Sequence, residues 1–212
     1  MKGPWVGRRM IPSPKEAAVK RPLVVSTRGG AELVPCCCGF VAQRTEEVYV
    51  GGSHDDASAE LERFAFLIGR YRCEARLKMP TGDWQRFTAA WEGRWILDGR
   101  AIADEYRMFG AGGEVLVLGL NVRAFDAAKK SWNIKWIDAL LGRWTDLGPE
   151  ELGGVHFEGG SVSYRFNEPM MPHAFTRATY TNVSERHFTW KGESSEDGKT
   201  WTEFMVVECE RE

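Results

Sequence analysis

The 212-residue chain has little proline and histidine and almost no net charge. It contains 9 Pro and 4 His, and its 28 basic residues nearly balance 30 acidic ones. A net charge of −2 creates no positive field for a phosphate backbone, so we expect no nucleic acid partner. No apolar run approaches the roughly 18 residues that a membrane-spanning helix needs. These absences predict a soluble, cytoplasmic, globular protein without a membrane span.

Cysteine and histidine are also too scattered to form a metal site. The 5 cysteines comprise the run Cys36-Cys37-Cys38 and the isolated Cys73 and Cys209. Adjacent cysteines pair poorly, so they do not indicate a disulfide framework. No cysteine or histidine pair stands at ligand spacing, and we expect no metal.

The charge is distributed unevenly along the chain. Residues 1–44 contain eight basic and two acidic residues, a net charge of +6, and five of the nine prolines. This composition predicts a flexible basic N-terminal extension over residues 1–56, which is either a tail or the product of an upstream start codon. An apolar segment of three residues, Leu23–Val25, is too short for a secretory signal peptide. We therefore place the folded domain at residues 57–212.

Glycine and tryptophan are abundant, with 23 Gly and 9 Trp. Residues 60–67 have room for a short helix, and strand-like alternation follows it. Turn residues such as Gly, Asp and Asn separate the alternating segments at hairpin spacing. The predicted strands are residues 71–77, 84–96, 101–109, 115–125, 131–138, 162–166, 175–183, 188–193 and 201–209.

About nine strands without a long central helix predict an all-β antiparallel meander. Closing the meander into a barrel removes its exposed edges. We therefore predict an antiparallel β-barrel of eight to ten strands with a short N-terminal helix, wide enough for one small ligand.

Several short motifs in this region resemble a known family in their order and spacing. They are Phe64-x-Phe66-Leu67-x-Gly69-x-Tyr71, Leu97-x-Gly99-Arg100-Ala101, Asp104-Glu105-Tyr106, Phe125-Asp126, Trp132, Trp136-x-Asp138 and Glu193-Ser194-Ser195-x-Asp197-Gly198-x-x-Trp201. The segment from Leu61 to Arg211 resembles an uncharacterised bacterial lipocalin-like family of the calycin superfamily.

The resemblance implies a barrel with a central cavity and no agreed catalytic residues. Calycin barrels usually open with Gly-x-Trp, whose Trp closes one end, and Tyr71 stands in that place here. We interpret this as an aromatic replacement whose hydroxyl reaches a partner at the rim. A related branch binds haem through a histidine, but its Gly-x-Trp-x-Gly-x-Gly opening is absent, so we predict no cofactor.

Alternation places Trp132, Trp136 and Asp138 on one face of residues 131–138. An unpaired carboxylate beside these rings would be costly to bury. Asp138 therefore either contacts the ligand or transfers a proton, or it has a structural role, in which it caps the following turn or pairs with Arg143.

Alternation also turns either Asp104 or Glu105 inward, with Tyr106 on the Asp104 face. A buried carboxylate in a small barrel commonly meets an arginine, and Arg177 is a candidate partner. Such a pair is either structural or orients the polar group of a ligand.

The predicted function is binding of a small, largely apolar or amphipathic molecule in the cavity. The candidate ligand-binding residues are Asp138, Trp136, Trp132, Asp104, Glu105, Tyr106, Arg177 and Trp95. One alternative is an enzyme that uses Asp138 or Glu105 for an isomerisation, cyclisation or hydration. Another is an oligomerising module, such as a homodimer formed through one apolar wall of the barrel.

Overall fold

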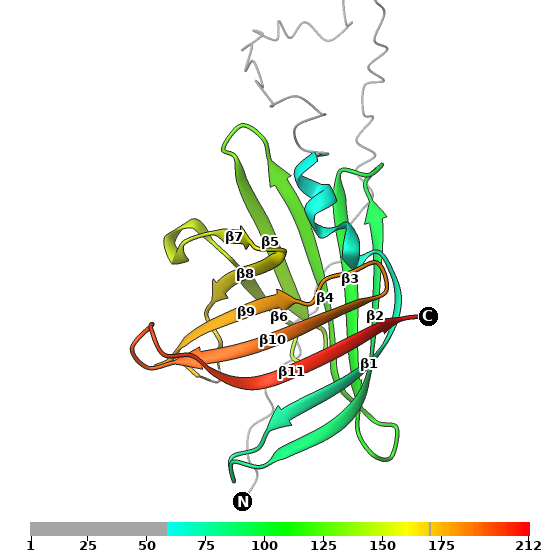
Figure 1. Ribbon diagram of the computed structural model, residues 1–212, viewed down its shortest axis with the longest axis vertical. Helices are drawn as coiled ribbons and strands as arrows, with labels where there is room; N and C mark the ends of the chain where they lie inside the picture. The colour runs from blue at the N-terminus through cyan, green and yellow to red at the C-terminus, as the bar shows by residue number, and fades with distance from the viewer. Residues whose placement is uncertain (1–58, 170) are drawn as a thin grey trace, which may run out of the picture. The chain divides into compact units, whose positions relative to one another are not determined.

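The computed structural model describes residues 59–169 and 171–212, which consist mainly of β-strands (Figure 1). The predicted extension 1–56, its boundary with the domain and Cys36, Cys37 and Cys38 lie outside the described residues. The elements are the 3-10 helices η1 (Glu62–Leu67) and η2 (Glu150–Leu152) and the strands β1 (Gly69–Lys78), β2 (Trp84–Ile96), β3 (Ala101–Phe109), β4 (Val115–Asp126), β5 (Ser131–Asp138), β6 (Arg143–Leu147), β7 (Val155–Glu158), β8 (Ser161–Phe166), β9 (Phe175–Thr181), β10 (His187–Ser195) and β11 (Thr202–Arg211).

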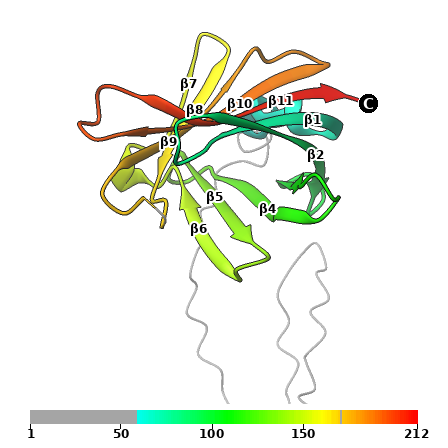
Figure 2. The same cartoon turned by 90° about the horizontal axis from the view of Figure 1, so that it is seen from below.

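The strands form one antiparallel sheet that closes on itself. Its order is β6-β5-β4-β3-β2-β1-β11-β10-β9-β8-β7. Strand β6 also pairs with β8 through Leu147 and Phe166, so ten strands form a barrel and β7 is an additional strand beside β8. Figure 2 shows the strands curling round from β11 and β1 to β5 and β6. The predicted all-β barrel of eight to ten antiparallel strands with a short N-terminal helix is confirmed.

Side chains alternate between the barrel interior and the outer surface. In β1, Tyr71, Cys73 and Ala75 are buried, whereas the intervening Arg72 and Glu74 are exposed. This alternation follows from the two-residue period of a strand, and it builds a core from the inner faces of all the long strands. Cys73 lies directly opposite Cys209 of β11, and both are free thiols.

Helix η1 fills one end of the barrel, which we call the closed end (cyan in Figure 1). Phe64 of η1 is fully buried and makes edge-on ring contacts with Trp132, at 4.9 Å, and Phe157, at 5.3 Å. Gly93 of β2 lets the backbone carbonyl of Leu67 approach, because any side chain at this position would collide with that carbonyl. The helix therefore acts as an aromatic plug.

Tyr71 secures the same end of the barrel. Its buried ring packs edge-on against Phe188 at a centroid distance of 4.9 Å. Its hydroxyl donates to the carbonyl of Phe66 and accepts a hydrogen bond from Arg211. Burial raises the pKa of Tyr71 although the Arg211 charge opposes this, so the hydroxyl remains protonated and can donate.

Two strands were not among the sequence predictions. Strands β6 and β7 flank a segment with three glycines and one proline, in which η2 forms a single 3-10 turn. Their ladders are short, because β6 spans five residues and β7 four. Strand β6 is important because it supplies the edge that closes the barrel.

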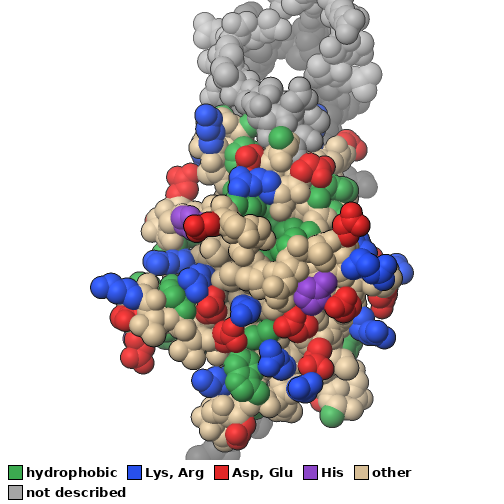
Figure 3. Space-filling model, in the orientation of Figure 1, with side chains coloured by type: hydrophobic (Ala, Val, Ile, Leu, Met, Phe, Trp, Pro, Cys, Tyr) green, Lys and Arg blue, Asp and Glu red, His purple; other side chains and the backbone are tan. Residues whose placement is uncertain are grey.

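The outer surface carries interspersed charges of both signs on the face drawn in Figure 3. Examples are the cross-strand ion pairs Arg70–Glu92 and Arg86–Glu74. Within the described ranges, no helix is both long and apolar enough to cross a membrane.

Candidate functional site

A cavity of about 260 Å³ lies inside the barrel, towards the end opposite η1, which we call the mouth. Its lining comes from every strand of the ten-stranded barrel except β1, and the exposed Leu141 of the β5–β6 turn contributes to it at the mouth. Aromatic rings dominate the lining: Trp91, Tyr106, Trp136, Tyr164, Phe166, Tyr180, Trp190 and Phe204.

The strand register arranges the inner residues in rows around the wall. One row runs from Trp91 through Tyr106, Gly119 and Asp138 to Arg143. The next row, one step deeper, places Asp104, Asn121 and Trp136 opposite one another. Only glycine fits at position 119, because the ring of Trp136 occupies the space where a side chain would begin.

Asp104 and Asn121 of this deeper row belong to a connected polar group of five side chains. Asp104 and Arg123 are both fully buried and form an ion pair. Asn121 donates from Nδ2 to Asp104 Oδ2 at 2.8 Å, and Arg123 donates from Nη2 to the Tyr180 hydroxyl at 2.9 Å. The Tyr164 and Tyr180 hydroxyls are 3.3 Å apart. The deep part of the barrel is therefore polar but electrically balanced.

Three side chains that line the cavity each retain a buried polar atom without a hydrogen-bond partner among the described residues. The atoms are Trp91 Nε1, the Tyr106 hydroxyl oxygen and Asn121 Oδ1. Burial raises the pKa of Tyr106, and the neighbouring Cys73 and Cys209 act in the same direction. The phenol therefore stays protonated and keeps its hydrogen-bond donor.

Asp138, Trp136 and Tyr106 are the predicted residues that line the cavity. Asp138 also holds the β5–β6 turn, since its Oδ1 accepts the backbone N–H groups of Leu140 and Leu141 at 3.0 Å each. It lies opposite Arg143 in the β5–β6 ladder. The predicted cap of the following turn is therefore present, and contact of Asp138 with a ligand stays a prediction.

Asp104 is the carboxylate that turns inward, but Arg177 is not its partner. The structure pairs Asp104 with Arg123. Arg177 lies on the outer face of β9, where it forms two hydrogen bonds to Glu193, at 2.9 and 2.8 Å, and stacks on Trp201 at 4.2 Å. The reason is the period of β9, which turns Thr176 and Ala178 inward and Arg177 outward.

The remaining predicted residues lie away from the cavity. Glu105 points outward and pairs with Arg107. Trp132 packs on Phe64 in the plug, and Trp95 packs against the core on the same row as Arg123. These two tryptophans support the closed end of the barrel.

Arg123 and Asn121 are polar residues of the interior that the sequence did not indicate. They lie in β4 between Leu118, Leu120 and Val122, which face outward. A hydrophobicity pattern would turn the leucines inward, so it predicts the wrong inner face for β4. The signal that could have identified Arg123 is that an inward Asp104 needs a cationic partner on a neighbouring strand.

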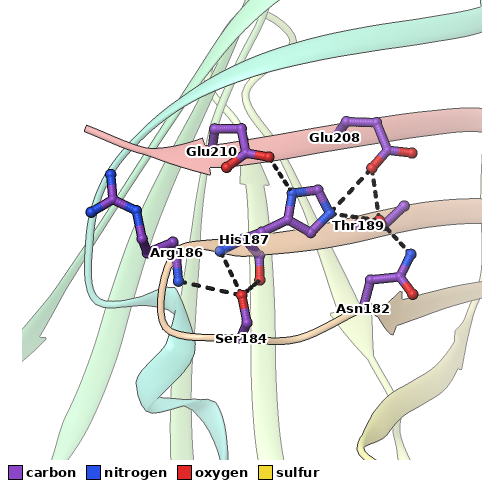
Figure 4. A network of polar contacts seen from close by, with 7 residues as sticks. All are labelled: Asn182, Ser184, Arg186, His187, Thr189, Glu208 and Glu210. Carbon is purple, nitrogen blue, oxygen red and sulfur yellow. Dashed lines mark hydrogen bonds and ion pairs between the residues drawn. The ribbon is translucent and has the colours of Figure 1, made fainter.

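A second polar cluster lies on the outer face of β10 and β11 (Figure 4). His187 contacts Glu210 through Nδ1 at 2.8 Å and Glu208 through Nε2 at 3.5 Å. Thr189 donates to Glu208 at 2.7 Å and accepts from Asn182 at 3.2 Å. These groups satisfy one another, and the part of the chain described here contains no group of His, Cys, Asp and Glu side chains suited to hold a metal ion.

Comparisons with known proteins place the fold. No family model and no curated protein matches the sequence. Among solved structures, the chain is similar to Rv2717c from M. tuberculosis, with a TM-score of 0.50 and 8% identity over 72% of this chain and 96% of that chain. At this identity the similarity shows a shared barrel fold, and membership of the lipocalin-like family remains a prediction.

Two further solved structures are more distantly similar. The S-type phycobiliprotein lyase CPES from Guillardia theta has a TM-score of 0.46 and 10% identity, over 74% of this chain and 93% of that chain. The protein EF1p2_mFAP2b, solved bound to DFHBI, has a TM-score of 0.36 and 9% identity, over 71% of this chain and 97% of that chain.

Proposed function

We propose that this barrel binds one small, largely apolar molecule in its cavity. The observation that carries the proposal is that the tryptophans and phenylalanines of the barrel do not fill its interior. They leave about 260 Å³ between aromatic walls. This volume is just below the roughly 300 to 1,000 Å³ of ordinary ligand pockets, which favours a ligand of one or two rings.

The walls support binding through shape and apolar contact. Tyr106 of β3 and Trp136 of β5 contribute rings from either side of β4, and Met205 adds an adaptable thioether. Asp138, Arg143 and Glu168 supply the charged part of the lining. Trp136, Tyr106 and Asp138 are therefore the predicted contact residues that we retain in the proposal.

Proton-transfer catalysis has less support than binding. Asp104 is neutralised by Arg123, and Glu105 lies outside the barrel. Asp138 lines the cavity, but its Oδ1 already accepts two backbone N–H groups of the β5–β6 turn, so this oxygen is engaged in holding the turn.

A matched pair of substitutions on one strand tests the proposal. Val117 lines the cavity, and the next residue, Leu118, faces outward. We expect the wild-type protein to bind naphthalene in calorimetric titrations and Val117→Trp to abolish this binding, whereas Leu118→Trp retains it. Absence of binding in the wild type, or full binding by a folded Val117→Trp protein, would overturn the proposal.

A complementary measurement examines the purified protein directly. Native mass spectrometry followed by solvent extraction should reveal a small molecule in a one-to-one ratio. Intrinsic tryptophan fluorescence should change when this molecule is removed, because Trp91, Trp136 and Trp190 line the cavity.

We place this activity in the cytoplasm and retain the homodimer as a prediction. Cys73 and Cys209 are free and lie opposite each other, which suits a reducing compartment. The outward Leu116, Leu118 and Leu120 of β4 give one wall the apolar character that a homodimer requires. Sedimentation velocity of the wild type and Leu120→Lys measures this association, and two identical monomeric profiles would contradict it.

A further inference from the structure

Trp91, Tyr106 and Asn121 form one patch of the cavity wall. Trp91 and Tyr106 are directly opposite in the β2–β3 ladder, with ring centroids 5.3 Å apart. Asn121 lies two residues along β4 from Gly119, the ladder partner of Tyr106. Each of the three side chains is 4% exposed. Gly119 carries no side chain, and the ring of Trp136 occupies the space over it, beside Asn121 in the β4–β5 ladder.

The unsatisfied atoms of this patch have defined hydrogen-bonding roles. Trp91 Nε1 can only donate, and the Tyr106 hydroxyl can donate and accept. Asn121 directs its Nδ2 to Asp104, so its unpaired Oδ1 is an acceptor. The patch therefore offers two donors and one strong acceptor on adjacent strands.

Leaving these atoms unpaired is unfavourable inside the barrel. A buried polar atom without a partner costs about 1 to 3 kcal/mol. Folded proteins pair most such atoms, and an unpaired cluster on a cavity wall points to a partner that enters the cavity. One polar group of a bound molecule has the size to contact neighbouring side chains of this kind.

The charge balance of the interior restricts that group further. Arg123 forms an ion pair with Asp104, donates to Tyr180 and is not among the residues that line the cavity, so it does not meet a ligand anion there. Asp104 is likewise occupied by Arg123 and Asn121, so it is not available to a ligand cation. A charged group placed deep in the cavity would lose its hydration without gaining a counter-ion.

We infer that the cavity selects a neutral aromatic ligand bearing one amide-type group, a carbonyl oxygen beside an N–H. The carbonyl accepts from Trp91 and Tyr106, the N–H donates to Asn121 Oδ1, and the aromatic body extends between the rings towards the mouth. This inference rests on the proposed function and adds the chemical class of the ligand to it.

Three probes that share one ring system test the inference by titration calorimetry: naphthalene, 2-naphthamide and 2-naphthoate. Because one or two hydrogen bonds are gained, 2-naphthamide should bind about tenfold tighter than naphthalene. The carboxylate of 2-naphthoate should bind more weakly than either neutral probe, because the deep cavity supplies no free cation.

Two tyrosine substitutions locate the effect. Tyr106→Phe removes the unpaired hydroxyl but keeps the ring, and we expect it to lower the ratio of 2-naphthamide affinity to naphthalene affinity about fivefold. Tyr164→Phe is the control, since that hydroxyl also belongs to a lining residue but already contacts Tyr180. It should retain the preference.

The outcomes separate the inference from the proposed function. Equal affinities for naphthalene and 2-naphthamide would overturn the inference and leave cavity binding intact. Full amide preference in Tyr106→Phe, or tighter binding of 2-naphthoate, would overturn it as well. If no probe binds, both proposals are wrong.

Discussion

The two ends of the barrel use the same strand alternation for different purposes. At the closed end, Phe64 and Trp132 pack edge to face, and Arg123 and Asp104 are buried without solvent contact. At the mouth, a cavity remains between the rings. Of the eight large hydrophobic side chains that are exposed in the described residues, only Leu97 lies at the closed end. We therefore expect the closed end to contribute more to stability than the mouth.

Removal of the buried cation from the closed end should have the largest effect on stability. Arg123→Met should lower the free energy of unfolding by about 3 to 5 kcal/mol, because Asp104 is left as an unpaired buried charge. Denaturant titration followed by circular dichroism measures the loss. The double variant Arg123→Met/Asp104→Leu should recover most of it, and equal losses in the single and double variants would contradict the ion pair as the cause.

The plug residue gives the next largest effect. Phe64→Ala should cost about 3 kcal/mol, because it leaves a cavity among packed rings. Leu141→Ala at the mouth should change stability by less than about 0.5 kcal/mol, since its side chain is 56% exposed. Thermal unfolding of the two variants compares the ends directly, and similar losses would mean that the mouth contributes equally to stability.

Removal of a single hydroxyl from each of two buried tyrosines compares the stability of the two regions more finely. Tyr180→Phe should destabilise the protein by about 1 to 2 kcal/mol, because Arg123 loses an acceptor. Tyr106→Phe should leave the stability of the unliganded protein unchanged or higher, since the hydroxyl that it removes has no partner. A clear loss in Tyr106→Phe would show that its hydroxyl is already satisfied.

The smallest expected effect concerns acid stability at the mouth. The backbone N–H groups of Thr200 and Lys199 lower the pKa of Asp197, in the β10–β11 turn, from 3.8 to about 2. Because the folded-state pKa is the lower one, the charged carboxylate favours the fold above about pH 4, and this contribution disappears as the pH falls towards 2. Asp197→Asn should flatten that part of the stability profile measured by urea titration. An unchanged slope between these pH values would contradict this role.

The fold could be predicted because its long strands are regular. Alternation in segments such as Ala101–Phe109 and Ser131–Asp138, with turn residues between them, fixed the class and most strand positions. The short strands β6 and β7 escaped prediction because four or five residues among glycines give little periodic signal.

The candidate site was only partly predictable. Alternation in β5 placed Trp136 and Asp138 on one face, and both line the cavity. The pairing of Asp104 with Arg123 depends on the β3–β4 register and on a strand whose more apolar face is turned outward. A single sequence does not give that register, so it could not distinguish Arg123 from Arg177 as the partner of Asp104. The structure places Arg177 on the outer face of the barrel.

The junction between β6 and β8 has a mechanical consequence for the barrel. The β6–β8 ladder consists of the pair Leu147–Phe166, with a further backbone bond from Gly148 N–H to the Arg165 carbonyl at 2.7 Å. By contrast, β1 and β2 share ten register pairs. The barrel can therefore widen at the β6–β8 junction while every long ladder stays intact. Such widening would enlarge the cavity and break very few hydrogen bonds.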